Sequence, residues 1–309
     1  MTTALLFPGQ GSQRVGMGRD LALEFAIARQ TFEEADDALG YAISTLCFEG
    51  PEDELTLTAN TQPAILANSI AVLRTLQQER GLTFDVAAGH SLGEWTALVA
   101  AGALRFSDAL SLVHLRGKAM QDAVPVGQGG MAAIMGLDLA GAEALCAAAS
   151  TATEQCSPAN LNGASQIVIS GHVGAIARAV EQAKGAGASR AVALQVSAPF
   201  HCPLMQPAAD ALAAALEPIE VMAPVVPVVA NVDAEPNSDP ARIKDLLVRQ
   251  VTGAVRWEQT VQRLVADGVT RAYELGSGMV LAGLVKRIAR RAIEITTIGE
   301  PHEVTGAEV

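Results

Sequence analysis

A serine flanked by glycines, between a short apolar run and a helix, constrains this chain most. Residues 89–93 read Gly-His-Ser-Leu-Gly, the pattern G-x-S-x-G. Residues 84–88 before it are typical of a strand, and residues 94–103, rich in Ala and Leu without Pro, are typical of a helix. A sharp strand-to-helix turn brings backbone close to the serine, so only residues without a Cβ fit on either side. The stretch predicts a nucleophile elbow with Ser91 beside the free N–H groups of a helix start.

The composition restricts the class of protein. With 309 residues, 50% of them hydrophobic, the chain can form a large core, and we expect one large α/β domain with a smaller insertion. The net charge of -12 argues against a nucleic-acid or anionic-membrane binder. The chain shows no basic leader and no apolar run of membrane-spanning length, so we expect a cytoplasmic protein. Its scattered cysteines, without a C-x-x-C pair, fit a reduced protein and predict no metal site.

The order of predicted elements gives the domain plan. Residues 4–7 read as a first strand and residues 8–13 as a glycine-rich turn, which lacks the features of phosphate-binding loops. We expect a loop at 58–63, with Gln62-Pro63 at the start of a helix to about residue 80, a basic helix at 280–291 and a frayed tail after residue 300. Residues 126–196 show the pattern β-α-β-α-β, which predicts an inserted ferredoxin-like small subdomain. Residues 1–125 and 197–309 predict an α/β-hydrolase-like catalytic domain with a central, mostly parallel sheet.

A serine nucleophile needs a base, and five histidines are the candidates. His90 adjoins Ser91, and neighbouring side chains diverge on a sharp turn, so it either lines the pocket or packs under the turn. His201 is the preferred base, because it lies in a proline-flanked loop where the chain returns from the insertion, and such loops face clefts. The remaining histidines lie in predicted helices or the tail: His114, His172 and His302. No acid stands at an obvious strand end, so we prefer a Ser–His dyad oriented by a carbonyl or an amide over a triad with Asp108, Asp122 or Asp138.

Several further stretches agree with the elbow, and together they resemble the malonyl-CoA:acyl carrier protein transacylase family. The resemblance covers essentially the whole chain in collinear order. The matching stretches are 7–13 (Phe-Pro-Gly-Gln-Gly-Ser-Gln), 61–64 (Thr-Gln-Pro-Ala), 89–94 (Gly-His-Ser-Leu-Gly-Glu), 116–120 (Arg-Gly-Lys-Ala-Met), 160–162 (Asn-Leu-Asn), 168–172 (Val-Ile-Ser-Gly-His), His201, 231–233 (Asn-Val-Asp) and 247–250 (Leu-Val-Arg-Gln).

The resemblance implies a ping-pong acyl transfer. Ser91 would attack the thioester of malonyl-CoA with His201 as general base, and the acyl group would then pass to the phosphopantetheine thiol of an acyl carrier protein supplied in trans. The backbone N–H groups of Gln10 and Leu92 would form the oxyanion hole, which typically contributes several kcal/mol to transition-state stabilisation. A main-chain carbonyl near Gln250 would orient His201.

The resemblance also implies how the acyl group is selected. Arg116 would receive the free carboxylate of the malonyl group, because a guanidinium offers planar paired donors. Gln62 would line the same pocket, and the implied substrate-binding set also includes His90, Asn160 and Gln250. Phe200, where many bacterial members carry Ser, would narrow the pocket toward malonyl over branched units. We expect no bound cofactor, no metal, no nucleic acid or membrane partner, and a monomer.

The sequence leaves open how the carrier docks and which related activity the chain has. The turn at 274–279 lacks the lysine often found there in the family, which puts a contact with carrier or CoA in doubt. Either of two basic clusters could dock the carrier: Lys286, Arg287, Arg290 and Arg291, or Lys184 with Arg190. The alternatives are a discrete acyltransferase of a polyketide synthase or malonate decarboxylase system, a serine thioesterase or hydrolase, and a non-catalytic carrier-binding protein.

Overall fold

The computed structural model describes residues 2–163, 165–196 and 198–309; Ser197, predicted to begin the returning main domain, lies outside them. A six-stranded sheet forms the centre of the main body, in the order β10-β9-β1-β2-β7-β8. Neighbouring strands pair in parallel except β7 and β8, which are antiparallel. The prediction of an α/β protein with a mostly parallel sheet is therefore confirmed. The strands are β1 (Thr2–Phe7), β2 (Val86–Gly89), β7 (Val228–Val229), β8 (Pro236–Asn237), β9 (Val269–Leu275) and β10 (Glu294–Ile298).

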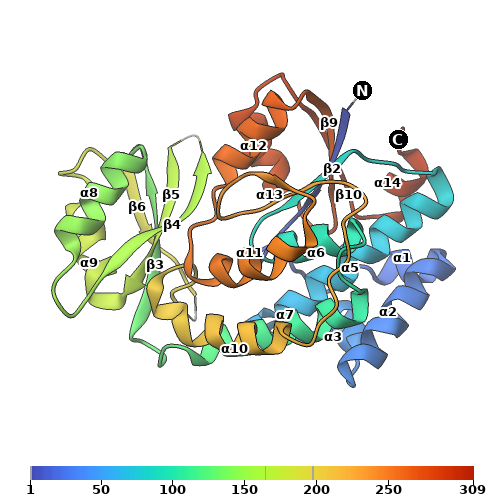
Figure 1. Ribbon diagram of the computed structural model, residues 1–309, viewed down its shortest axis with the longest axis horizontal. Helices are drawn as coiled ribbons and strands as arrows, with labels where there is room; N and C mark the ends of the chain where they lie inside the picture. Colours follow the sequence, from blue (N-terminus) through green and yellow to red (C-terminus); the bar gives the residue numbers. More distant parts are fainter. Residues whose placement is uncertain (1, 164, 197) are drawn as a thin grey trace.

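Helices cover both faces of this sheet, and β1 shows why (Figure 1). Its residues 4–7 are all apolar and have no exposed surface, as expected for a central parallel strand. Leu5 and Phe7 point to one face and join the core of α2 (Ala26–Leu39), α5 (Thr58–Arg80), α7 (Phe106–Asp122) and α10 (Gln206–Leu216). Ala4 and Leu6 point to the other face, under α12 (Trp257–Ala266) and α13 (Val280–Ile288).

The other elements of the main body surround these layers. They are α1 (Arg19–Glu24), α3 (Ile43–Glu49), α4 (Glu52–Thr56), α6 (Leu92–Ala100), α11 (Pro240–Thr252), α14 (Pro301–Gly306) and the 3-10 turn η1 (Pro203–Met205). Along the described residues, no helix is both long and apolar enough to cross a membrane.

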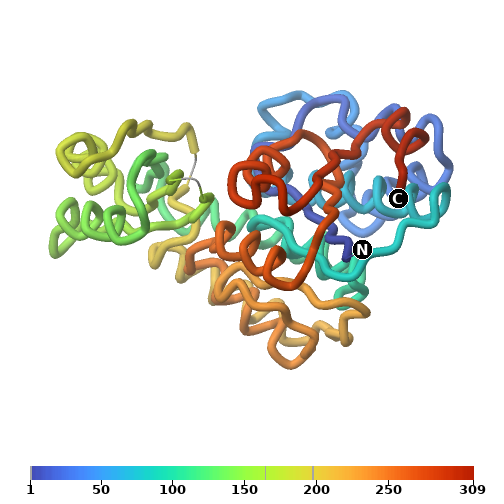
Figure 2. Tube along the Cα trace, turned by 90° about the horizontal axis from the view of Figure 1, so that it is seen from above, coloured from blue at the N-terminus to red at the C-terminus, as the bar shows by residue number. Residues whose placement is uncertain are grey.

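A second, smaller sheet stands to one side of the main body (Figure 2). Its four strands follow the order β4-β5-β3-β6, and all neighbours are antiparallel. The elements are β3 (Gly129–Met135), α8 (Leu139–Ala149), β4 (Cys156–Gly163), β5 (Gln166–His172), α9 (Val173–Ala183) and β6 (Arg190–Ala193). The sequence pattern missed β4, because its residues are mostly polar or small. Pairing with β5 orders them as a strand.

The predicted loop at 58–63 is wrong, because α5 begins at Thr58 and contains Pro63. A proline inside a helix cannot donate a hydrogen bond to the carbonyl four residues earlier, here that of Ala59. His114 lies 3.0 Å from this carbonyl oxygen through its Nδ1 and supplies the missing partner. The helix therefore tolerates Pro63, and His114 has a structural role.

The predicted frayed tail is also wrong. Glu300 and Glu303 form a capping box at the start of α14, and Pro301 takes the first helical position. Val304 is fully buried, and Arg80 donates to the carbonyl of Ala307 at 2.6 Å. The predicted basic helix ends earlier than expected, at Ile288.

Candidate active site

The serine turn follows the carboxyl end of β2, a central strand of the sheet that pairs with β1. Gly89 pairs with Phe7, and Ser91 has a positive φ of 52°, which holds it in a strained turn before α6. A Cβ on Gly93 would lie 1.9 Å from the carbonyl oxygen of Phe7, and one on Gly89 would lie 2.0 Å from the Gly93 carbonyl carbon. Both glycines are therefore required by close backbone contact, as the sequence pattern predicts.

His201 contacts the serine directly. Its Nε2 lies 2.7 Å from the Ser91 Oγ, and its Nδ1 lies 2.8 Å from the carbonyl oxygen of Gln250. Because a carbonyl only accepts, Nδ1 carries the proton and Nε2 is free to accept from the serine hydroxyl. Burial and then the charge of Arg116 lower the pKa of His201 to about 3, so the ring is neutral at physiological pH.

The candidate acids and other histidines lie elsewhere. Asp138 caps α8 by accepting from the N–H of Gly141 at 2.8 Å. Asp108 and Asp122 belong to the first turn and the end of α7. In place of an acid, the Gln250 carbonyl orients the imidazole. His172 lies on the small sheet and His302 on α14.

Arg116 reaches the same serine from α7. It is 1% exposed, and its Nη2 donates to the Ser91 Oγ at 3.1 Å and to the Gln250 Oε1 at 2.9 Å. Its Nη1 donates to the Gln62 Oε1 at 2.7 Å. Its Nε is buried and has no hydrogen-bond partner in the described part of the chain. Burial lowers the pKa of Arg116 to about 10, which keeps it charged at neutral pH. The guanidinium is thus a buried cation whose hydrogen-bond partners are neutral, while the charge of the buried Glu94 opposes the lowering of its pKa.

A cavity of about 420 Å³ opens in front of Ser91. Residues from the main body and from the small sheet line it together. Of the predicted site residues, the cavity wall contains Gln10, Gln62, His90, Ser91, Arg116, Asn160, Phe200 and His201. Leu92 is buried as the first residue of α6, where N–H groups have no acceptor within the helix. Gln250 is buried behind the wall.

Two polar residues of this wall differ in their partners. The Nε2 of His90 lies 2.9 Å from the Asn162 Oδ1, and its ring lies 5.7 Å from that of Trp257, between centroids. His90 therefore both lines the cavity and packs beside the turn. The Oδ1 of Asn160 is buried without a hydrogen-bond partner among the described residues.

Two residues that sequence reasoning gave no role fix the elbow. The Asn231 Oδ1 accepts from the Ser91 N–H, and its Nδ2 donates to the Gly89 carbonyl, both at 2.7 Å. The buried Glu94 Oε2 accepts from the Asn231 N–H at 2.9 Å and from the Gln250 Nε2 at 2.7 Å. Burial raises the pKa of Glu94 to about 7. Asn231 thus joins both sides of the turn, and Glu94 joins Asn231 to Gln250. The only sequence signal was the place of both residues in matched motifs.

A neutral histidine on a strained serine, beside a buried cation, is typical of α/β enzymes that use a serine nucleophile. A family model described as acyl transferase domain matches residues 4–296. The malonyl CoA-acyl carrier protein transacylase of Salmonella typhimurium is 48% identical over 304 residues, 98% of each chain. The chain belongs to the acyl transferase domain family and, within it, to the malonyl CoA-acyl carrier protein transacylases. The resemblance predicted from the motifs is confirmed.

Solved structures agree in fold as well as in sequence. The acyl-carrier-protein-S-malonyltransferase of Bartonella henselae is 50% identical with a TM-score of 0.95, over 99% of this chain and 98% of that one. A malonyl-transacylase solved in complex with its type II polyketide synthase acyl-carrier protein is 45% identical with a TM-score of 0.95, over the same shares of both chains. In the described residues, no group of three His, Cys, Asp or Glu side chains could hold a metal ion.

Proposed function

We propose that this chain transfers a malonyl group from malonyl-CoA to the phosphopantetheine thiol of an acyl carrier protein through a malonyl ester on Ser91. One observation carries the proposal: the Ser91 Oγ lies 2.7 Å from a neutral imidazole nitrogen and 3.1 Å from a buried guanidinium. The first group activates a nucleophile, and the second offers a charge to a carboxylate. Acyl-CoA substrates without a carboxylate would not use the second group.

The two half-reactions follow from this geometry. His201 takes the proton from the Ser91 Oγ as the oxygen attacks the thioester carbonyl carbon, and the carbonyl oxygen becomes an oxyanion. The N–H groups of Gln10 and Leu92 are the proposed donors to it, since Gln10 lines the cavity and Leu92 opens α6. Collapse breaks the C–S bond, and the imidazolium returns the proton to the CoA thiolate. The carrier thiol then attacks the ester by the same steps in reverse.

Arg116 is the proposed receptor for the malonyl carboxylate. It forms no ion pair in the described residues: its hydrogen-bond partners are neutral, and Glu94 acts on it only through its charge. A bound carboxylate would pair this cation, whereas an acetyl group would leave it buried and unpaired, which is costly. Phe200 lines the same cavity as Arg116, and its ring is proposed to leave room only for a small, unbranched acyl group. Asn160 lines the same cavity and is a further proposed contact of the substrate.

The domain plan is part of the same proposal. The small subdomain, residues 126–196, is ferredoxin-like: its antiparallel order β4-β5-β3-β6, with a helix after β3 and another after β5, supports this topology. The segments 1–125 and 197–309 form an α/β-hydrolase-like catalytic domain, supported by the serine turn at the end of a central parallel strand. The cavity then lies between the two domains.

The carrier is a separate, acidic protein in this proposal, and the enzyme acts as a monomer. We place the docking surface at the basic cluster of α13 and the turn after it, because this cluster has four cations and the alternative, Lys184 with Arg190, has two. Its four cations are exposed and form no ion pair in the described residues: Lys286, Arg287, Arg290 and Arg291. Reversing the charges of Lys286 and Arg287 should raise the KM for carrier several-fold without changing malonyl-CoA loading. The same charge reversal at Lys184 and Arg190 is the matched control. A larger increase of the KM for carrier in that control would place the docking surface at Lys184 and Arg190 instead.

Intact mass spectrometry tests the central reaction. The wild type mixed with malonyl-CoA should gain one malonyl group, and Ser91→Ala should gain none. The wild type should gain no comparable adduct from acetyl-CoA, whereas Arg116→Ala should shift toward acetyl. Steady release of free CoA without an adduct would indicate a thioesterase. Neither adduct nor release would contradict catalysis by this serine.

A further inference from the structure

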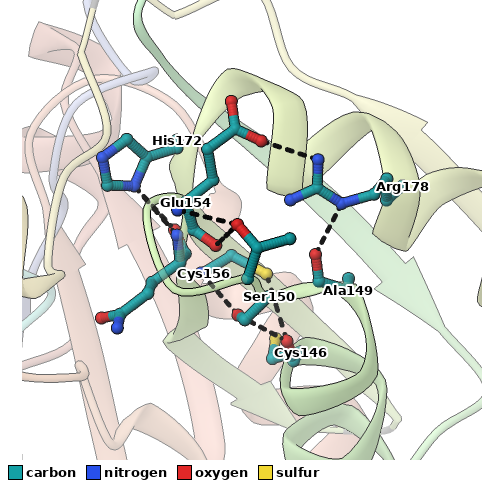
Figure 3. Close-up of polar contacts among 9 residues, drawn as sticks. Cys146, Ala149, Ser150, Glu154, Cys156, His172 and Arg178 are labelled. Atoms are coloured by element: carbon teal, nitrogen blue, oxygen red, sulfur yellow. Dashed lines mark hydrogen bonds and ion pairs between the residues drawn. The ribbon is translucent and has the colours of Figure 1, made fainter.

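Two thiols meet in the small subdomain, outside the cavity of Ser91 (Figure 3). Cys146 lies near the end of α8, and Cys156 begins β4. The Cys156 Sγ lies 3.7 Å from the Cys146 carbonyl oxygen and donates to it. Ser150 ties the two backbones together: its hydroxyl donates to the Cys146 carbonyl at 2.7 Å and accepts from the Cys156 N–H at 3.1 Å. The fold therefore holds the two cysteine residues next to each other.

The two thiols have unlike surroundings. Cys146 is 3% exposed, whereas Cys156 is only half-buried. Arg178 lies beside the pair; it donates to the Ala149 carbonyl at 2.8 Å and pairs with Glu154 at 2.6 Å (Figure 3). The Cys146 thiol, the Ser150 hydroxyl and the Arg178 charge lower the pKa of Cys156 to about 7. The bond to Cys156 and burial raise the pKa of Cys146. Cys156 is the nucleophile of the pair, and Cys146 keeps its proton.

Cys156 is also open to a small molecule. It lines a cavity of about 60 Å³ together with Ser170, His172 and Cys202. This volume holds about two water molecules, and so also a small hydroperoxide. Cys202 is a poor competitor for a reagent in this cavity, because it is 1% exposed and its Sγ donates to the Pro199 carbonyl at 3.1 Å.

We propose that Cys156 and Cys146 form a hydroperoxide-reactive dithiol site, with Cys156 as the attacking sulfur and Cys146 as the resolving thiol. The Cys156 thiolate attacks the hydroxyl oxygen of the hydroperoxide, so that an S–O bond forms and the O–O bond breaks; the alkoxide or hydroxide that leaves takes a proton from solvent. The sulfur is oxidised by two electrons to a sulfenic acid. The Cys146 sulfur then attacks it; the S–S bond forms, the S–O bond breaks, and the thiol proton leaves with the hydroxyl as water. This chemistry does not depend on acyl transfer at Ser91.

The test treats the reduced full chain with hydrogen peroxide, blocks remaining thiols with an alkylating reagent and maps peptides without reduction. We expect a Cys146–Cys156 cross-linked peptide that dithiothreitol reverses. Cys146→Ser should trap the sulfenic acid on Cys156, where dimedone captures it. Cys47→Ser is the matched control, because that cysteine is fully buried in α3, and it should leave the cross-link unchanged.

Alkylation without peroxide gives an independent measurement. Near neutral pH, iodoacetamide should label Cys156 about threefold faster than an unperturbed thiol in a short peptide, because its larger thiolate fraction outweighs the lower nucleophilicity of a low-pKa thiolate. Cys156→Ala and Cys156→Ser should both abolish the cross-link while keeping the wild-type circular dichroism spectrum. Dimedone on Cys202 instead of Cys156, a disulfide between other cysteines, or labelling no faster than the peptide would overturn the proposal.

Discussion

His201 should remain an unprotonated base far below the pH at which an ordinary histidine gains its proton. Its pKa is lowered to about 3 by burial and by the charge of Arg116, against about 6.5 for an exposed imidazole. A lowered pKa means that the neutral form persists as the pH falls. For kcat/KM of serine acylation, which reports on the free enzyme, an ordinary histidine predicts a loss of about tenfold between about pH 7.5 and 5.5. The structure predicts a loss of less than about twofold over the same interval.

The assay is rapid-quench mass spectrometry of the malonyl-enzyme at limiting malonyl-CoA and constant ionic strength. Glu94 complicates the profile, because its pKa of about 7 places its titration inside the measured interval. Glu94→Gln removes that titration, and its amide oxygen can still accept from the Asn231 N–H and the Gln250 Nε2, which both donate to one carboxylate oxygen. An inflection near pH 7 that disappears in Glu94→Gln belongs to Glu94. A tenfold loss centred near pH 6.5 in Glu94→Gln would refute the reasoning about His201.

Further predictions concern specificity, the elbow and stability. Arg116→Ala should lower kcat/KM for malonyl-CoA by about 100-fold, the low end for breaking a buried charge pair, without lowering that for acetyl-CoA; parallel kinetics with both substrates check this. Asn231→Ala removes two hydrogen bonds from the serine turn, and we expect kcat to fall more than about tenfold with little change in KM, measured by steady-state kinetics with Ser91 intact. Gly93→Ala places a Cβ 1.9 Å from a backbone oxygen of β1 and should cost several kcal/mol of unfolding free energy. Gly283→Ala, with no atom within 4 Å, should be neutral or stabilising in the same denaturant titration.

Local features of the sequence were sufficient for the serine turn. The glycines around Ser91 are required by contacts within a few residues and with the neighbouring strand, and that requirement is visible as the pattern itself. The alternation of apolar runs and helical periods likewise predicts a parallel sheet, because a central parallel strand is apolar on both faces. The role proposed for Arg116 could not be predicted from local sequence alone. An arginine within a helix has no local feature that distinguishes a carboxylate receptor from a surface charge. Only the agreement of several motifs suggested its role.

The features that could not be predicted from the sequence depend on contacts between residues far apart in the chain. Asn231 reaches the Ser91 N–H across 140 positions of the chain, and it does so because β7 pairs with β2 at Val229 and Ala88. No periodicity encodes that register. The start of α5 depends in the same way on His114, whose ring bonds a carbonyl that Pro63 leaves free. In both cases a distant side chain satisfies a backbone group, and local propensity gives no indication of it.

Arg116 connects substrate choice to the strength of the base. In the free enzyme its charge lies 3.1 Å from the Ser91 Oγ and is the second cause of the low His201 pKa. A bound malonyl carboxylate would offset that charge, so the imidazole should gain basicity when the correct acyl group occupies the cavity. An acetyl group has no carboxylate to offset the charge of Arg116, so the pKa of His201 stays low. On this argument the acid limb of kcat for malonyl transfer lies at higher pH than that of kcat/KM. In the proposed mechanism, the same guanidinium therefore binds the malonyl carboxylate and, once paired with it, allows His201 to become a stronger base.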